Sequence, residues 1–357
     1  MHRLFSFTQP RLCHSLVRYI FAHQLYTLNS ASQNLRIQKI IAAISIGLFI
    51  VKILAWYITG SVAILTDALE SIVNVVAGLI GVYSLQVSAR PRDQDHPYGH
   101  GKVEFISAAI EGTLILVAGI LIIYEAVSNL LGSSHVINKL DYGIYLVAAT
   151  AIINYAAGMV CVNTGKKNNS LALIASGKHL QSDTYTTAGI IAGLVLLYFT
   201  NLGWIDSAVA ILFAVIILIT GYKIIRSSIA GIMDEADTGL LKEMVGTLNK
   251  NRSANWIDLH NLRIIKYGST LHLDCHLTVP WYFNVVEAHQ EIENLSEEVK
   301  KHYGRSIELF IHSDACVDFS CPICEKMDCP VRKHPFVKKI DWNLENVSAN
   351  HKHSLNS

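Results

Sequence analysis

The sequence predicts a multi-pass α-helical membrane protein, with six transmembrane helices followed by a C-terminal cytoplasmic α+β domain. Of its 357 residues, 51% are hydrophobic and only 16% are charged, whereas soluble domains contain about 25% charged residues. The apolar residues gather in six stretches close to the roughly 20 residues that cross a bilayer, and most of the charge follows Met233. The net charge of +1 disfavours a polyanionic partner such as nucleic acid.

Residues 1–38 are polar to mixed and contain no segment typical of a cleavable signal peptide. We expect a cytoplasmic tail there, either helical on the membrane surface or unstructured. The six predicted spans are Ile40–Tyr57, Val62–Val87, Val103–Leu131, Leu140–Val162, Leu171–Phe199 and Ile205–Ile225. Lys and Arg concentrate in the loops after spans two, four and six, which predicts that these loops and both termini are cytoplasmic. The expected location is a cell membrane, in the first instance a bacterial inner membrane.

A soluble domain is predicted from Gly239 onward. Leu240–Leu248 and the amphipathic segment Val285–Tyr303 are expected helices, and Ile257–Lys266, Leu271–Val279 and Ile307–Ile311 are expected strands. The order αββαβ is that of a small ferredoxin-like module. The predicted division is therefore a tail (1–38), a transmembrane domain (39–228), a soluble domain (229–315) and a Cys-rich segment with a polar tail (316–357).

Two predicted spans carry polar pairs that point to an ion site. His179 and Asp183 are four residues apart in the fifth span, as are Glu70 and Asn74 in the second, so each pair stacks on one helix face. Four N and O ligands with one His suit Zn²⁺, and Fe²⁺, Mn²⁺ or Co²⁺ remain alternatives. Asp67 could support the ligands or replace one of them. The structural alternative is that these groups only hydrogen-bond between helices.

The loop after the second span offers another candidate site. Asp93, His96 and His100 are spaced so that a carboxylate and two imidazoles can reach one ion. The alternative is an ordinary polar loop, since loops are generally polar. In the second predicted strand, His276 alternates with the apolar set and is expected on the open face of the sheet.

Four further candidate ligands form a CxxxxCxxCxxxxC run: Cys316, Cys321, Cys324 and Cys329. In a reducing cytoplasm, closely spaced cysteines indicate a thiolate metal site rather than disulfides. A structural zinc site, a metal-capturing tail and redox-sensitive thiols all remain open. Cys13, Cys161 and Cys275 are isolated and are expected to be packing residues.

Five segments together resemble the cation diffusion facilitator family of divalent-metal transporters. They are SVAILTDALESIVN, RPRDQDHPYGHGK, SGKHLQSD, HNLR and IHSDAC, and the resemblance runs from about residue 40 to residue 315. It implies a six-helix homodimer in the lipid bilayer that exports a divalent metal from the cytoplasm in exchange for protons, without an organic cofactor. The transport-site positions it implies are Glu70, Asn74, His179 and Asp183.

The resemblance also assigns roles outside the spans. It implies a peripheral metal site at Asp93, His96 and His100 and a charge link between Lys102 and Asp234. It further implies a cytoplasmic metal cluster at the dimer interface, with ligands His260, His276, His289, His312 and Asp314. A His-decorated sheet without metal is the alternative for this cluster, because His is readily a surface residue.

The sequence departs from the family at the second span. Family members usually have Asp or His at the Glu70 position and Asp at the Asn74 position. Asn supplies only a neutral carbonyl oxygen, so the preferred metal and the proton stoichiometry are open. Two other functions compete with zinc export: a metal-dependent intramembrane enzyme, for which the spans show no nucleophile and base, and a membrane metal sensor without transport.

Overall fold

The structure is a computed structural model that describes residues 11–59, 62–131, 143–200, 204–268, 270–303 and 307–355. Within the helices, some side chains, among them those of residues 62–70 and 190–200, lie outside the description. The chain divides into a helical unit built around Ser30–Met233 and a C-terminal unit built around Asp234–Lys266 and Thr270–Ser357. Each unit is described by itself.

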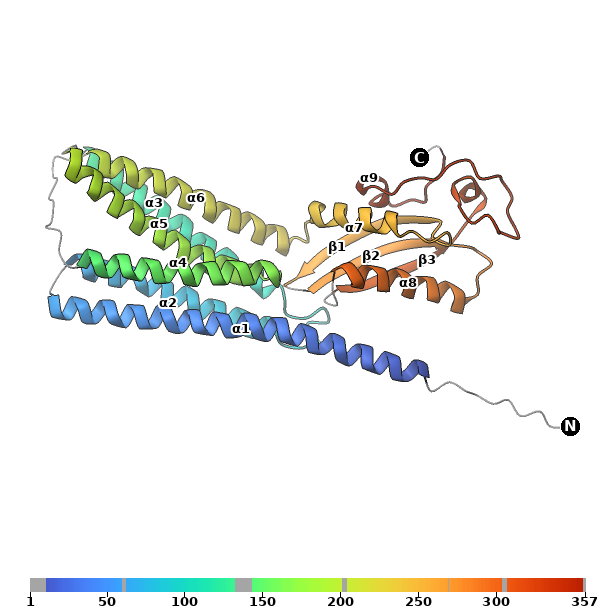
Figure 1. Cartoon of the computed structure of the whole chain (residues 1–357), viewed down its shortest axis with the longest axis horizontal. Helices are drawn as coiled ribbons and strands as arrows, with labels where there is room; N and C mark the ends of the chain where they lie inside the picture. The colour runs from blue at the N-terminus through green and yellow to red at the C-terminus, as the bar shows by residue number, and fades with distance from the viewer. Residues whose placement is uncertain are drawn as a thin grey trace. The chain divides into compact units, whose positions relative to one another are not determined.

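Six long helices make up the first part of the chain, in the residues that the structure covers (Figure 1). They are α1 (Arg11–Thr59), α2 (Val62–Ser88), α3 (Val103–Leu131), α4 (Gly143–Lys167), α5 (Leu171–Thr200) and α6 (Trp204–Ile232). Each contains most of one predicted span. The predicted start of the fourth span, Leu140, falls outside the described residues. The first helix differs most from expectation, because it begins at Arg11 rather than near Ile40.

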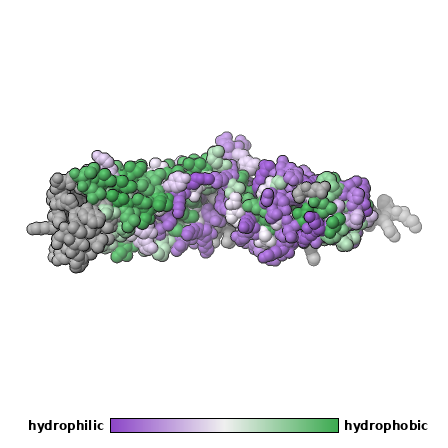
Figure 2. All heavy atoms as spheres, turned by 90° about the horizontal axis from the view of Figure 1, so that it is seen from above, coloured by the Kyte–Doolittle hydropathy of each residue, from purple (hydrophilic) through white to green (hydrophobic). Residues whose placement is uncertain are grey.

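The outer surface of the helical unit is apolar. Large aliphatic side chains such as Leu54, Leu121, Ile152 and Leu212 are more than half exposed, and green apolar residues cover much of this part in Figure 2. Three helical segments are long and apolar enough to cross a membrane among the described residues: Ala31–Leu54, Val103–Ser128 and Ala210–Ile232. Exposed aliphatic side chains are stable on this surface when they face lipid, where backbone hydrogen bonds must be satisfied within helices.

The helices pack closely where small residues face one another. α4 packs on α5, α3 on α6, and α5 also contacts α2, α3 and α6. At the α4–α5 contact, a Cβ on Gly177 would lie 2.7 Å from the carbonyl oxygen of Gly158. Glycine is therefore needed there for the backbones to approach, as is common where membrane helices associate.

The C-terminal unit contains the predicted αββαβ order, and with the helical unit it confirms the predicted fold class. Its elements are α7 (Thr238–Lys250), β1 (Asp258–Tyr267), β2 (Thr270–Val279), α8 (Val285–Tyr303) and β3 (Ile307–Ala315). The strand order is β1-β2-β3, and β2 and β3 pair in parallel with His276 opposite His312. The crossover that parallel strands require is α8. Gly268, with φ +60°, begins the turn between β1 and β2.

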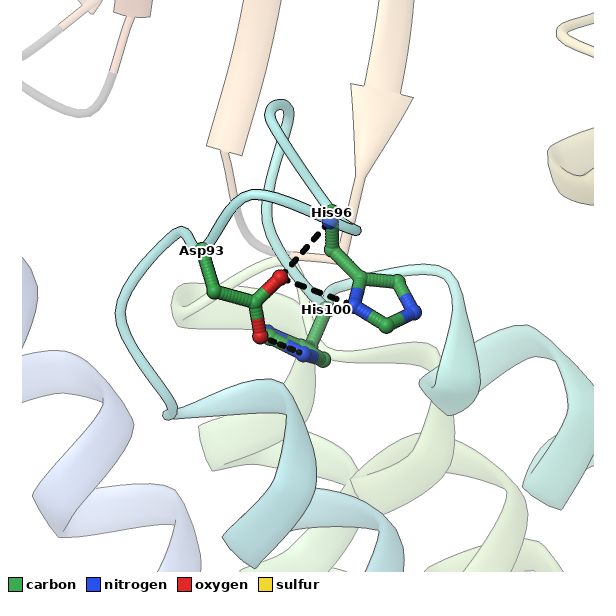
Figure 3. Close-up of side chains that lie close together, drawn as sticks. All are labelled: Asp93, His96 and His100. Atoms are coloured by element: carbon green, nitrogen blue, oxygen red, sulfur yellow. Dashed lines mark hydrogen bonds and ion pairs between the residues drawn. The ribbon is translucent and has the colours of Figure 1, made fainter.

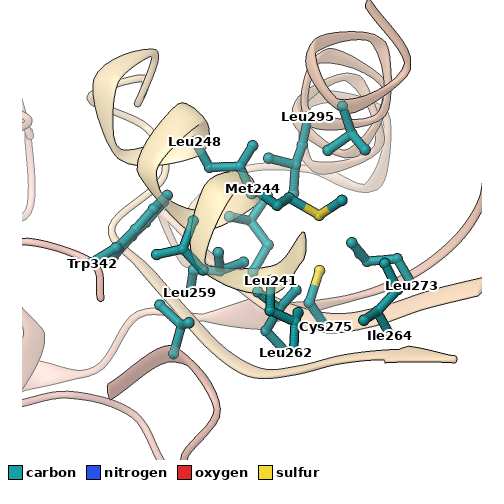
Figure 4. Close-up of a cluster of buried hydrophobic side chains, with 14 of the residues drawn as sticks. Leu241, Met244, Leu248, Leu259, Leu262, Ile264, Leu273, Cys275, Leu295 and Trp342 are labelled. Atoms are coloured by element: carbon teal, nitrogen blue, oxygen red, sulfur yellow. The ribbon is translucent and has the colours of Figure 1, made fainter. Parts of the chain in front are cut away.

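One hydrophobic core fills the space between the sheet and its helices (Figure 4). Met244 and Leu248 of α7 and Leu295 of α8 meet Leu259 and Leu273 of the strands, all at most 1% exposed. Apolar residues recur at every second position of β2, which follows from side-chain alternation in a strand. Cys275 belongs to this core and Cys161 to a core of the helical unit, so the prediction that both are packing residues is confirmed.

The segment after β3 folds back onto the C-terminal unit. It contains a 3₁₀ turn, η1 (Asp318–Ile323), and a short helix, α9 (Leu344–Val347), which packs on α7. Trp342 is buried in the core. Beyond α9, the carbonyl of Ala349 accepts a hydrogen bond from the amide of Asn261 in β1 (2.8 Å). The end of the chain is thereby attached to the first strand of the sheet.

Candidate metal sites

In the helical unit, α2 and α5 bring two of the four predicted ligands together. His179 is 6% exposed, and its Nε2 lies 2.8 Å from Oδ1 of Asn74, which joins the two helices. Asp183 is half-buried one turn further along α5. The side chains of Glu70 and Asp67 in α2 lie outside the described residues.

Sequence reasoning missed a cation next to this position. Lys52 of α1 is 5% exposed, and its ammonium donates a hydrogen bond to Oγ of Ser71 in α2 (2.8 Å). A lysine inside an apolar span is costly, so its presence in the sequence was a signal that could have been used.

Two buried carboxyl groups of α3 were also missed. Glu111 accepts a hydrogen bond from Ser176 of α5 (2.7 Å), and Ser176 in turn accepts one from Gln38 of α1 (3.0 Å). Glu104 accepts hydrogen bonds from Ser88 (2.8 Å) and from Ser170. These bonds tie α1, α2 and α3 to α5, which carries His179.

The loop between α2 and α3 forms a compact group of possible metal ligands (Figure 3). Oδ1 of Asp93 lies 3.0 Å from Nδ1 of His96 and also accepts from the His96 amide (2.7 Å), while Oδ2 lies 3.3 Å from Nε2 of His100. The ligand atoms of the three residues all lie within 4.8 Å of one another. Desolvation opposes ionisation of Asp93, but the hydrogen bonds from His96 and the nearby imidazoles hold the pKa of this carboxyl below its ordinary value.

Lys102, one partner of the predicted charge link, lies near the end of α6. Nζ of Lys102 donates to the carbonyl of Ile232, the last residue of α6 (3.5 Å). Asp234 follows two residues later with φ +56°. The structure thus brings Lys102 to the end of the helix that leads to Asp234.

A second group of possible metal ligands, also with ligand atoms within 4.8 Å of one another, lies on the sheet of the C-terminal unit. Oδ2 of Asp314 is 3.2 Å from Nε2 of His260 and 3.2 Å from Nδ1 of His276, and the three ligand atoms lie within 4.8 Å of one another. His312 approaches the other carboxylate oxygen of Asp314 (3.3 Å). Each of the three strands β1, β2 and β3 contributes a residue to this group. Two imidazole nitrogens and a carboxylate suit Zn²⁺ or a similar ion.

His289 is not brought to this group within the chain. It lies on α8, where its side chain is 67% exposed and its Nε2 is 3.7 Å from Glu293. His312 is also largely exposed, at 66%. The described chain therefore assembles His260, His276, His312 and Asp314, and leaves His289 on the helix surface.

Asp258 and His353 support the group but were not predicted. Oδ2 of Asp258 is 3.2 Å from Nδ1 of His260, and the same carboxylate accepts a hydrogen bond from the amide of His353 (3.1 Å) and contacts its ring. Burial raises the pKa of Asp258, yet the His260 and His353 imidazoles beside it hold that pKa well below its ordinary range. Conversely, burial lowers the pKa of His353, but the hydrogen bond to Asp258 raises it overall.

The four cysteines of the Cys-rich run line one cavity at the end of the sheet. They are free thiols. Burial raises the pKa of the Cys316 and Cys324 thiols, and their thiol neighbours raise it further. The structure thus brings together residues that are up to 13 positions apart in the sequence.

Two known protein families match the chain in succession. The cation efflux transmembrane domain matches residues 39–233, and the cytoplasmic domain of cation efflux proteins matches residues 242–316. The first match contains the α2–α5 pair and the loop group, and the second contains the ligands on the sheet. Cys321, Cys324 and Cys329 lie beyond both.

Several curated proteins are similar over most of their length. An uncharacterized transporter of Synechocystis sp. is 31% identical over 268 residues, which cover 74% of this chain and 86% of that protein. The manganese efflux system protein MneS of Bacillus subtilis is 24% identical, covering 74% of this chain and 91% of MneS. The cation-efflux pump FieF of Shewanella oneidensis is 25% identical, covering 76% and 90%.

Proposed function

Since this chain belongs to the cation diffusion facilitator family of cation efflux transporters, we propose that it exports a divalent transition metal in exchange for protons. Zn²⁺ is the first candidate for this metal. The observation that carries this proposal is the contact between His179 and Asn74. It joins a buried imidazole of α5 to an amide of α2 inside the apolar unit. Glu70 and Asp183 complete the proposed ligand set.

Proton exchange follows from the chemistry of these ligands. A metal ion needs neutral imidazole and ionised carboxylates, so protons compete with it for the site. Histidine titrates near neutral pH and can hand over a proton in this range. With Glu70 and Asp183 ionised, the site carries a charge of about −2, which matches a divalent ion. A site open to the cytoplasm then loads metal, and the same site opened outward releases it on protonation.

A second candidate is export of Mn²⁺ by the same mechanism. Asn74 offers its amide oxygen where carboxylate is usual, and oxygen-rich sites suit harder ions such as Mn²⁺. The relation to a manganese efflux protein supports testing this ion. Competition between Zn²⁺, Mn²⁺, Fe²⁺, Co²⁺ and Cd²⁺ in a flux assay, repeated with Asn74→Asp, distinguishes the candidates.

The other sites are proposed to serve transport from the cytoplasmic side. The loop group would hold an ion near the mouth of the pathway. The ligands on the sheet would sense cytoplasmic metal and draw two C-terminal units into a homodimer. In this proposal the C-terminal unit and both termini lie in the cytoplasm, and the helical unit lies in the lipid bilayer.

The test is metal-dependent proton movement in proteoliposomes containing the full-length protein. Asp183→Ala removes one charged ligand, so we expect loss of metal flux and of the accompanying pH change. Asp274→Ala is the matched control, because it removes an exposed carboxylate from β2, and we expect it to transport like wild type. Undiminished exchange in Asp183→Ala would refute the proposed site, and metal flux without a pH response would refute antiport.

A further inference from the structure

The four cysteines that line the cavity of the C-terminal unit have no part in the proposed transport cycle. We propose that Cys316, Cys321, Cys324 and Cys329 form a tetrahedral four-thiolate site for one Zn²⁺ ion, which fastens the segment after β3 to the end of the sheet. Three of these residues lie beyond the matched cytoplasmic domain, which ends at residue 316. The site is separate from the His and Asp groups described above.

The backbone around the cysteines forms a turn and hydrogen-bonds to two of the sulfur atoms. Cys321 and Cys324 flank the sequence Pro-Ile, the amide of Cys324 donates to the carbonyl of Cys321 (3.3 Å), and both residues line the cavity. The amide of Trp281 donates to Sγ of Cys316 (3.4 Å), and the backbone at Lys326 likewise hydrogen-bonds to the Cys324 thiol. Backbone groups therefore contact two of the four sulfur atoms and hold them at the cavity.

The cavity has the size of a single ion. Its volume is about 20 Å³, which is enough space for about one water molecule. Zn²⁺ with thiolate ligands needs little more, because Zn–S bonds are about 2.3 Å long and four ligands close a structural site. The remaining lining residues include Ile257 and Pro280, which keep bulk water and competing ligands from this side of the cavity.

Cations are positioned to balance the excess negative charge of such a site. Four thiolates and one Zn²⁺ leave a charge of −2, and Lys326 and Arg332 both line the cavity. The Arg332 guanidinium donates to the carbonyls of Cys321 (2.9 Å), Cys324 (3.0 Å) and Lys326 (2.7 Å). It therefore fixes the turn that carries two of the ligands while it places a positive charge beside them.

The chief rival is a redox pair formed by Cys321 and Cys324. A CxxC spacing is typical of such pairs, in which one thiol attacks and the other resolves. A redox pair does not require two more thiols in the same cavity, nor an arginine that braces the backbone of both cysteines. Four thiols that line one cavity favour the ion, which would draw their sulfur atoms together, because no three of these atoms lie within 4.8 Å of one another.

The experiment uses the purified full-length protein, stripped with a chelator and then loaded with Co²⁺ alone. Tetrahedral Co²⁺ with thiolate ligands has a sulfur-to-metal charge-transfer band, which imidazole and carboxylate sites lack. We expect this band in wild type and in His276→Ala, its disappearance on addition of Zn²⁺, and a lower intensity per bound Co²⁺ in Cys324→Ser, which retains three of the four thiolates. Cys161→Ala, which removes a thiol from α4 in the other unit, is the matched control and should retain the band.

A second measurement needs no variant. In the metal-free wild type, Cys316, Cys321 and Cys329 are half-buried and should react with a maleimide, and Zn²⁺ should protect all of them, as seen by mass spectrometry of each peptide. Absence of the charge-transfer band in wild type, an undiminished band in Cys324→Ser, or unchanged alkylation with Zn²⁺ would overturn the proposal. A Cys321–Cys324 disulfide in protein purified without reductant would instead establish the redox pair.

Discussion

His260 shows how a candidate metal ligand on the sheet is held by its neighbours. Its Nδ1 lies against Asp258 and its Nε2 against Asp314, so the two nitrogens have different partners. A carboxylate beside the inner nitrogen fixes which nitrogen is left for an ion, and such supporting groups tune metal affinity. Asp258 is therefore expected to matter for metal binding although it is not itself a proposed ligand.

We expect Asp258→Asn to weaken metal binding at the sheet by about 10- to 100-fold, the usual effect of removing a supporting carboxylate. Isothermal titration of the full-length protein with Zn²⁺ measures the affinity. Asp274→Asn is the control, because Asp274 lies exposed on the neighbouring strand and should leave the titration unchanged. Equal affinities in wild type and Asp258→Asn would show that the contact is structural.

Asp237 gives the C-terminal unit a dependence on pH. Its Oδ2 lies 2.7 Å from Nζ of Lys266, and its Oδ1 accepts from the Leu240 amide at the start of α7 (3.0 Å). The Lys266 ammonium, followed by the Leu240 amide, holds the pKa of Asp237 below its ordinary value. Because the folded-state pKa is lowered, the ion pair stabilises the fold above the unfolded pKa of about 3.9 and this contribution is lost as pH falls through the lowered pKa.

Asp237→Asn should therefore lower the stability by about 1 kcal/mol or less at neutral pH, since both side chains are more than a third exposed and Asn still caps a helix. The difference in Tm from wild type should stay constant near neutrality and shrink as the pH falls below about 4. Glu243→Gln on the same helix controls for net charge. A difference in Tm that does not depend on pH would contradict the ion-pair account.

At the scale of single residues, most of the candidate ligands could be predicted from the sequence, but the residues that hold these ligands in place could not. Asp93, His96 and His100 are close in sequence, so their spacing alone predicted that they would meet. Asp258 and His353 are 95 residues apart, and no local pattern links a tail residue to a strand. Contacts of this kind depend on the path of the whole tail, which the sequence left open.

At the scale of elements, the approach of α4 to α5 determines where His179 lies. Gly177 is two residues before His179, and its Cβ position is occupied by the Gly158 backbone at 2.7 Å. Any side chain there must separate the two helices, and overpacking of this kind typically costs about 1–3 kcal/mol. The proposed ligands His179 and Asp183 on α5 would move with the helix.

We predict that Gly177→Ala lowers both the Tm and the metal flux of the reconstituted protein. Gly47→Ala in α1 is the matched control, because nothing lies within 4 Å of its Cβ position, and it should behave like wild type. If Gly177→Ala transports at the wild-type rate, the close approach is not needed to place His179.

The third strand illustrates where local propensity fails. We predicted Ile307–Ile311, but β3 continues to Ala315 and includes Ser313 and Asp314, which are poor strand residues. Its pairing with β2 runs on to Thr278–Asp314 and Val279–Ala315. Parallel pairing with a neighbouring strand overrides propensity, and this extension puts Asp314 into the ladder next to His276.

At the scale of the whole molecule, the fold class was predictable because hydropathy separates the two units so sharply. Apolar runs of bilayer length define the helices, and period-two alternation defines the sheet. The extent of α1 was not predictable in the same way. Its N-terminal part is polar to mixed, so it lacks the apolar periodicity that marks the other helices.

Metal binding at the sheet should stabilise the molecule, since an ion that binds only the folded state adds about 2.7 kcal/mol at 100 times its dissociation constant. We expect Zn²⁺ to raise the Tm of the C-terminal unit relative to chelator-treated protein, and Asp314→Asn to reduce that rise. His302→Gln, on the surface of α8, is the control. A rise in Tm that is the same in Asp314→Asn and wild type would place the responsible ion elsewhere.

The return of the tail to β1 has a practical consequence for handling the protein. Ala349 and His353 contact β1 within three residues of His260. A polyhistidine tag added after residue 357 would begin only five residues beyond His353 and would supply competing imidazoles close to the candidate ligands on the sheet. Metal affinities should therefore be measured on protein whose purification tag is of another kind or has been removed by proteolysis.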